Sequence, residues 1–120
     1  MDPISILVVD DDPDLRETIC QLLLDEGYQV TGARNGLEAL ARLGGTPRPA
    51  VVLLDLMMPE MSGWEVRQHM LADAGLASIP VVVMTASQNP GGELAPAELL
   101  KKPLDLDQLL DAVRRHSGTN

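Results

Sequence analysis

The sequence predicts an α/β fold, a doubly wound domain in which helices cover both faces of a parallel sheet. Two observations lead to this prediction. Short runs rich in Val, Ile and Leu alternate along the chain with amphipathic helical patterns, and most of these runs lack the polar alternation of a strand with one solvated face. The chain has 120 residues, which is enough for one core and too few for two. We therefore expect one domain over residues 1–120, with its core at about 4–116.

Five segments are expected to form the strands of the sheet. Most of them are short, apolar and bounded by Pro, Gly or Asp, which is the pattern of a strand buried on both faces. The second segment is weaker than the first, third and fourth, and the fifth is only a fragment. In chain order the segments are Ile4–Val9, Tyr28–Ala33, Ala50–Leu54, Val81–Met84 and Leu99–Leu100.

Helices are expected between these strands and after the last one. Asp12 and Pro13 have the residue types preferred at the N-cap and the first helical position, and the helical spacing of apolar residues then continues to a stop at Gly27. Residues 88–92 (Gln-Asn-Pro-Gly-Gly) break any helix there, so the fourth helix should be short or irregular. Asn35-Gly36 should open a short helix that is closed by Gly44-Gly45. The other helices are expected from about Trp64 to Ala72 and after Asp105, which forms a capping-box-like start with Gln108.

Composition narrows the classes of partner. Eighteen acidic residues against nine basic ones give a net charge of −9, which argues against direct binding to nucleic acid or to an anionic membrane, since both need a basic surface. The single cysteine, Cys20, rules out an internal disulfide and fits a reducing compartment. No apolar run approaches the roughly 20 residues of a membrane span, and residues 1–3 carry no basic segment of a signal peptide. We expect a cytoplasmic domain.

Polar residues stand where the expected strands end. Asp10 and Asp11 follow the first strand, Asp55 the third, Thr85 the fourth, and Lys102 the fifth. The carboxyl ends of parallel strands meet at one edge of the sheet, where ligands bind. Carboxylates crowded together repel one another unless a cation lies between them, and an all-oxygen set suits Mg²⁺. An acceptor carboxylate, a metal ion, an ammonium group and a hydroxyl together favour in-line phosphoryl transfer.

Four sequence segments carry a resemblance to a known family, in order and at suitable spacing along nearly the whole chain. They are Ile6–Asp14, Asp55–Gly63, Met84–Ala86 and Lys102–Pro103. With them the chain resembles the receiver domains of response regulators in bacterial two-component signalling, and in particular the single-domain chemotaxis receivers. The resemblance implies a flavodoxin-like sheet of five parallel strands in the order 2-1-3-4-5, and a cis Lys102–Pro103 bond.

The resemblance also implies a role for each candidate site residue. Asp55 would accept the phosphoryl group from a sensor histidine kinase or a histidine phosphotransfer protein. Such a domain phosphorylates and dephosphorylates itself as a signalling step and is not a turnover enzyme. Mg²⁺ would be coordinated directly by Asp11 and Asp55, through water by Asp10, and by the backbone carbonyl of Met57. Thr85 would supply the switch hydroxyl, and Lys102 would contact the phosphoryl group. Ala86 would be the small residue that keeps the phosphoryl pocket open.

The sequence departs from the family pattern in the region that normally transmits phosphorylation to a partner. Family members usually carry Tyr or Phe three residues before the lysine, and this chain has Leu99. Residues 88–92 also shorten the fourth helix. These departures favour an alternative function, a docking module that binds its partner regardless of phosphorylation. Since only four residues follow His116, we expect the output to pass through a separate effector protein or a domain outside this sequence.

A phosphatase of the haloacid-dehalogenase type is a further alternative, because it also begins with a strand ending in Asp-x-Asp. Asp10 would then be the nucleophile and Asp12 the acid–base. However, Asp14 stands where that family has Thr or Val, and 120 residues leave no room for a substrate cap. A calcium-binding EF-hand loop is excluded, because Leu15 and Gln21 occupy the positions that need Gly and Glu.

Overall fold

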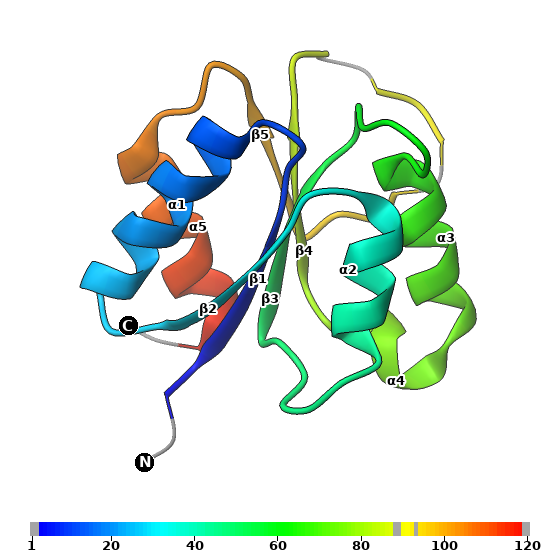
Figure 1. Ribbon diagram of the computed structural model, residues 1–120, viewed down its shortest axis with the longest axis horizontal. Helices are drawn as coiled ribbons and strands as arrows, with labels where there is room; N and C mark the ends of the chain where they lie inside the picture. The colour runs from blue at the N-terminus through cyan, green and yellow to red at the C-terminus, as the bar shows by residue number, and fades with distance from the viewer. Residues whose placement is uncertain (1–2, 88–89, 93, 119–120) are drawn as a thin grey trace.

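The computed structural model describes residues 3–87, 90–92 and 94–118. The strands are β1 (Ser5–Val9), β2 (Gln29–Ala33), β3 (Val51–Asp55), β4 (Val81–Thr85) and β5 (Glu98–Lys101). The helices are α1 (Pro13–Asp25), α2 (Gly36–Leu43), α3 (Gly63–Ala72), the short α4 (Ala74–Ala77) and α5 (Leu106–Ser117). All strand pairings are parallel and the order is β2-β1-β3-β4-β5, which confirms the predicted fold class and strand order (Figure 1).

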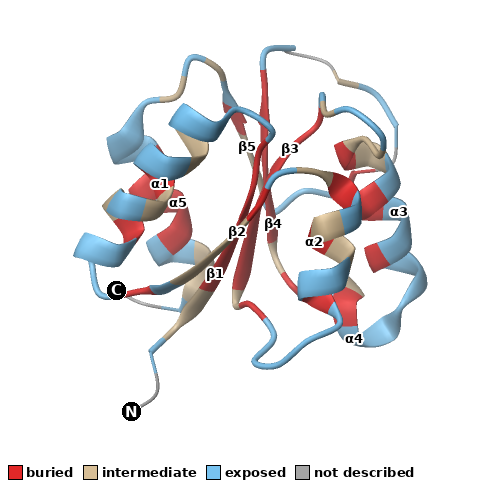
Figure 2. Cartoon of the chain, in the orientation of Figure 1, coloured by how far each residue is buried: buried red, intermediate tan, exposed pale blue. Residues whose placement is uncertain are grey.

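The sheet is the middle layer of three. Helices α1 and α5 cover one face, and α2, α3 and α4 cover the other (Figure 1). Alternate residues of each central strand point into two separate cores: Leu7 and Val9 pack with α2 and α3, whereas Ile6 and Val8 pack with α1 and α5. The central strands are therefore buried on both faces (Figure 2), which is why they lack polar alternation.

Side chains of the sequence itself fix where the helices begin. The carboxylate of Asp12 accepts hydrogen bonds from the backbone N–H groups of Asp14 and Leu15, and thereby caps α1 as predicted. Asn35 caps α2 and Asp105 caps α5 in the same way. Helix α3 begins one residue earlier than predicted, at Gly63, behind a capping box that was not anticipated, Ser62 with Glu65.

The crossover between β4 and β5 (residues 86–97) contains no helix in its described residues, in agreement with the predicted short or irregular fourth helix. Residues 88 and 89 of the helix-breaking pattern lie outside the described residues. Gly91 and Gly92 both have φ +74°, a left-handed conformation that ends any helix. The short α4 lies before β4 instead.

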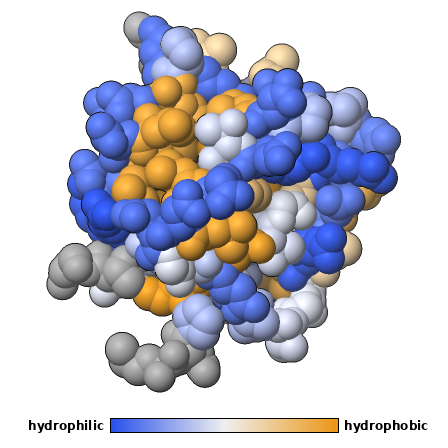
Figure 3. Space-filling view, turned by 60° about the vertical axis from the view of Figure 1, so that its left-hand side comes forward, coloured by the Kyte–Doolittle hydropathy of each residue, from blue (hydrophilic) through white to orange (hydrophobic). Residues whose placement is uncertain are grey.

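The surface over α1 and α5 is not uniformly polar. Figure 3 shows hydrophobic side chains between hydrophilic ones on this side of the molecule, and Leu22 and Leu106 line a groove there with Asp14 and Glu17. None of the helices in the described part of the chain is long and apolar enough to cross a membrane.

Candidate functional site

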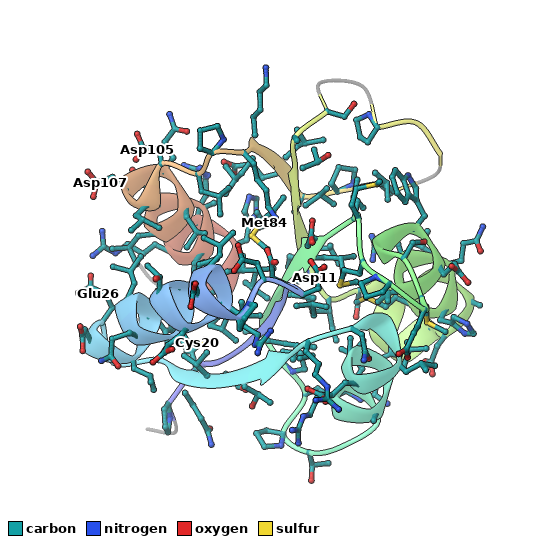
Figure 4. All side chains as sticks on the ribbon, turned by 45° about the horizontal axis from the view of Figure 1, so that its top comes forward. Asp11, Cys20, Glu26, Met84, Asp105 and Asp107 are labelled. Carbon is teal, nitrogen blue, oxygen red and sulfur yellow. The ribbon has the colours of Figure 1, made fainter. Side chains whose placement is uncertain are left out.

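Three carboxylates meet at the carboxyl edge of the sheet. Each of Asp10, Asp11 and Asp55 offers an oxygen within 4.8 Å of the others, because β1 and β3 are neighbours and end at the same level. Figure 4 looks onto this edge, with Asp11 near its centre. Asp10 is fully buried and Asp55 is 4% exposed, whereas Asp11 is exposed to solvent. The predicted acidic residues therefore form one cluster that is open on the Asp11 side.

Hydrogen bonds hold both the carboxylate and the backbone carbonyl of Asp10. One carboxylate oxygen accepts a hydrogen bond from the backbone N–H of Asp12 at 2.9 Å, and the other accepts one from Lys102 Nζ at 3.0 Å. Its backbone carbonyl accepts a hydrogen bond from Arg16 Nη1 at 2.7 Å. Arg16 was missed by the sequence reasoning, because a contact to a backbone carbonyl leaves no motif.

A glycine allows the loop after Asp55 to return close to the strand. A Cβ atom at Gly63 would lie 2.3 Å from the Asp55 carbonyl oxygen and 2.7 Å from Leu56 Cα, and the Gly63 N–H donates to the Leu56 carbonyl at 2.9 Å. No side chain fits this approach. Gly63 thus brings the start of α3 against the backbone of the candidate acceptor.

Lys102 bridges two of the carboxylates. Its Nζ lies 3.0 Å from Asp10 and 3.3 Å from Asp55. The Lys102 backbone N–H donates to the Thr85 carbonyl at 2.8 Å, and the Lys102–Pro103 bond is cis as predicted. Lys101 is exposed, so the structure brings Lys102 rather than Lys101 into the site.

Thr85, Ala86 and Met57 line a common hollow. The hollow has a volume of about 390 Å³, and Trp64, Ser87 and Pro90 complete its lining. Thr85 is 3% exposed, and its hydroxyl oxygen accepts a hydrogen bond from the Ser87 N–H at 3.1 Å. Met57 is 70% exposed. All three predicted residues thus line one hollow at the ends of β3 and β4.

The cluster carries more negative charge than the protein neutralises. Burial, followed by the charge of Asp10, raises the pKa of Asp55 to about 6, although Lys102 acts in the opposite direction. Burial by itself lowers the pKa of Lys102, but its hydrogen bond to Asp10 and the charges of Asp55 and Asp10 raise that pKa above its ordinary value. The ammonium group therefore stays charged, and it contacts two of the three acids, Asp10 and Asp55.

The donor set fits a hard divalent cation. The three carboxylates supply only oxygen atoms, the preferred ligands of Mg²⁺, and the exposure of Asp11 leaves one side for water. A divalent ion would also relieve the repulsion that raises the pKa of Asp55. The residues present therefore suit the predicted Mg²⁺.

The geometry speaks against the phosphatase alternative. The proposed acid–base of that mechanism, Asp12, uses its carboxylate to cap α1. The proposed nucleophile, Asp10, is fully buried, and both of its oxygens are engaged by Asp12 and Lys102. Neither side chain is free for the role that this mechanism needs.

Comparisons with known proteins agree on one family. The family model described as the response regulator receiver domain matches residues 6–114. Response regulators of Synechocystis and Mycobacterium are 38% and 36% identical over 94% and 93% of this chain, but the chain spans only about half of their length. The protein PilH of Pseudomonas aeruginosa is 32% identical over 90% of this chain and 93% of its own length.

Solved structures show the same likeness. The chemotaxis protein CheY4 of Vibrio cholerae superposes with a TM-score of 0.87 at 28% identity, covering 96% of this chain and 99% of that one. The response regulator TrrA of Thermotoga maritima, solved in complex with Mg²⁺ and beryllium fluoride, gives a TM-score of 0.81 at 32% identity, covering 93% of this chain and 97% of that one.

Proposed function

The chain belongs to the response regulator receiver domain family of two-component signalling, and from this premise we propose that Asp55 is its phosphoacceptor. The proposed donor is a phosphohistidine on a sensor histidine kinase or a histidine phosphotransfer protein. A carboxylate oxygen of Asp55 attacks the phosphorus, a new O–P bond forms, and the P–N bond to the imidazole breaks. The leaving imidazole takes a proton from solvent, and the product is an aspartyl phosphate.

The other residues of the site position the phosphoryl group and neutralise its charge. Lys102 would contact a phosphoryl oxygen, which its distance of 3.3 Å from Asp55 supports, and the Thr85 hydroxyl would donate to another. Ala86 leaves the space that the group needs, since it lines the hollow without filling it. This division of labour is what in-line phosphoryl transfer requires, because positioning and electrostatics supply most of its catalysis.

Mg²⁺ is the proposed cofactor. Asp11 and Asp55 would bind it directly, Asp10 through water, and Met57 through its backbone carbonyl. When bound, the ion offsets the charge of the carboxylates and of the transferred group. The closeness of the three carboxylates and the Mg²⁺ complex of the related TrrA support this assignment.

We further infer that residues 1–120 form one receiver domain with its core at about 4–116, which the family match over 6–114 supports. Its reaction is a signalling step and not repeated turnover, and the expected cytoplasmic location stays a prediction. The proposed recipient of the signal is a downstream effector, either a separate protein or a domain outside this sequence.

The observation that carries the proposal is the contact of a buried acid, Asp55, with Lys102 beside two further carboxylates. The test is mass spectrometry of the intact protein after incubation with acetyl phosphate and Mg²⁺. We expect the mass of one phosphoryl group in the wild type and in the control Ser87→Ala, and none in Asp55→Asn. Label that persists in Asp55→Asn would refute the assignment.

Phosphorylation-independent docking remains the second candidate, because the crossover lacks a helix in its described residues and Leu99 replaces an aromatic residue. It concerns the output and leaves the acceptor chemistry intact. Partner affinity that is the same with and without beryllium fluoride would favour it.

A further inference from the structure

Helix α3 holds the crossover between β4 and β5 at two points. At the first point the indole Nε1 of Trp64 donates to the Gly91 carbonyl at 3.0 Å. At the second point Arg67 donates through Nε to the Leu94 carbonyl at 2.6 Å, and through Nη2 to the Ala95 carbonyl at 3.0 Å. Gly91, Leu94 and Ala95 of the crossover are therefore held against α3 by side-chain contacts, in the segment where the family has a helix.

These two points of attachment, the Trp64 anchor and the Arg67 anchor, differ in how firmly they hold the crossover. Arg67 is 4% exposed and Leu94 is 5% exposed, so freeing this point would leave a buried guanidinium without its acceptors and would uncover an apolar side chain. Ala95 has φ +40°, an unfavourable conformation for a residue with a Cβ, and its bond to Arg67 helps to hold it there. By contrast, the bond from Trp64 to Gly91 lies at the surface and involves no charged group.

A hinge lies between the two anchors. Gly91 and Gly92 both have φ +74°, and a Cβ at Gly92 would lie 2.9 Å from Trp64 Cδ1. Both glycines line a hollow of about 370 Å³ that also reaches Leu99. The neighbouring Pro90 lines the 390 Å³ hollow that Trp64 shares with Thr85. Residues 90–92 thus have both the backbone freedom and the space to move.

We propose that Trp64 responds to the phosphorylation state of Asp55 by releasing Gly91. A phosphoryl group on Asp55 draws the Thr85 hydroxyl towards it, the adjoining end of the crossover follows, and the Trp64–Gly91 bond opens. Residues 90–92 then pivot, while Arg67 keeps residues 94–97 in place. The inference rests on the proposed function of Asp55. In this proposal Trp64 on α3 responds to phosphorylation, whereas in other family members an aromatic side chain at the position of Leu99 does so.

The only tryptophan of the chain makes this movement measurable. Its indole N–H gives a single cross-peak in a nitrogen-15 NMR spectrum of the full chain. With Mg²⁺ and beryllium fluoride, a phosphoryl mimic, we expect this proton to exchange with water about tenfold faster or more, because its hydrogen bond is lost. The Ala97 N–H, which donates to the Val81 carbonyl at 2.9 Å, should keep its protection. Loss of protection at Ala97 would place the hinge elsewhere and overturn the inference.

The variant Trp64→Phe tests whether the Trp64–Gly91 hydrogen bond is coupled to phosphoryl binding or only packs the crossover against α3. If binding of beryllium fluoride must break the Trp64 bond, then Trp64→Phe, which keeps a ring but has no N–H, should bind the mimic about two- to fivefold more tightly. His69→Ala, an exposed position on the same helix, is the control and should bind as the wild type does.

Fluorine-19 NMR shows independently whether the mimic is bound. Bound mimic with unchanged indole exchange, or Trp64→Phe with wild-type affinity, would overturn this inference and leave the proposed function standing. No bound mimic, together with no phosphoryl group on Asp55 by mass spectrometry, would overturn both.

Discussion

Replacing Asp55 by asparagine should stabilise the metal-free protein at neutral and alkaline pH. Asparagine keeps the shape of the side chain and removes its charge. The pKa of Asp55 is about 6 in the folded protein, against an ordinary value of 3.8. Each tenfold change in an acid dissociation constant corresponds to about 1.4 kcal/mol, so the buried charge costs about 3 kcal/mol once Asp55 is ionised. This cost already includes the attraction to Lys102.

The sign of the pH dependence follows from the same values. Because folding raises the pKa of Asp55, the folded protein binds more protons than the unfolded chain between about pH 4 and pH 6. The stability that protonated Asp55 contributes is fully present below this window and is lost as the pH rises through it. In Asp55→Asn this part of the pH dependence should vanish, and the gain in unfolding free energy should reach its full size above the window.

The assay is urea unfolding in the presence of a chelator, at several pH values from about 5 to about 8. Asp111→Asn is the matched control, because Asp111 is exposed, and its unfolding free energy should change by no more than about 0.5 kcal/mol. Saturating Mg²⁺ should shrink or reverse the advantage of Asp55→Asn, since the ion binds the charged carboxylate. An Asp55→Asn variant that is no more stable than the wild type at about pH 8 without metal would refute the reasoning.

Three further predictions follow from the site. Asp11→Ala should weaken Mg²⁺ binding about tenfold or more in calorimetry without lowering metal-free stability, because it removes an exposed ligand and a repelling charge; unchanged affinity would place the metal elsewhere. Gly63→Ala should lower the unfolding free energy by about 2 kcal/mol or more in urea, because its Cβ would meet the Asp55 carbonyl; wild-type stability would contradict this. The phosphorylated protein should be long-lived, because neither Met57 nor Ser87 orients an attacking water well. Dephosphorylation should therefore be faster in Met57→Asn and in Met57→Asn/Ser87→Glu, and decay that is unchanged or slower would contradict this account.

The fold was predictable where burial imposes a pattern and less so where it does not. The central strands are apolar because both of their faces are covered, so their positions could be read from composition. The first of them was predicted to end at Val9, as it does, but β3 and β4 each extend one residue further than predicted, since Asp55 and Thr85 are polar yet still pair within the sheet. The edge strand β5 has only two apolar residues between Glu98 and Lys101, and this left its limits undefined in the sequence.

The acidic cluster and Lys102 were predictable because parallel strands bring their carboxyl ends together. The supporting contacts were not. Arg16 and Arg67 both donate to backbone carbonyls, and a carbonyl is present at every residue, so no sequence pattern marks the acceptor. Trp64 could be read only as a covering side chain, because its contact with Gly91 spans 27 residues.

Lys102 joins the chemistry of the site to the stability of the sheet edge. In the structure its ammonium group forms ion pairs with Asp10, which follows β1, and with Asp55, the last residue of β3. On the proposed function, a phosphoryl group converts Asp55 into an acyl phosphate and adds oxygens that compete for the same ammonium group. Asp10 would then depend on its hydrogen bond from Asp12 and on the metal. Because Lys102 also donates its backbone N–H to the Thr85 carbonyl, a change of partner at its side chain acts on the β4 end as well. Through these contacts Lys102 would link phosphoryl binding to β4, the strand from which the crossover departs.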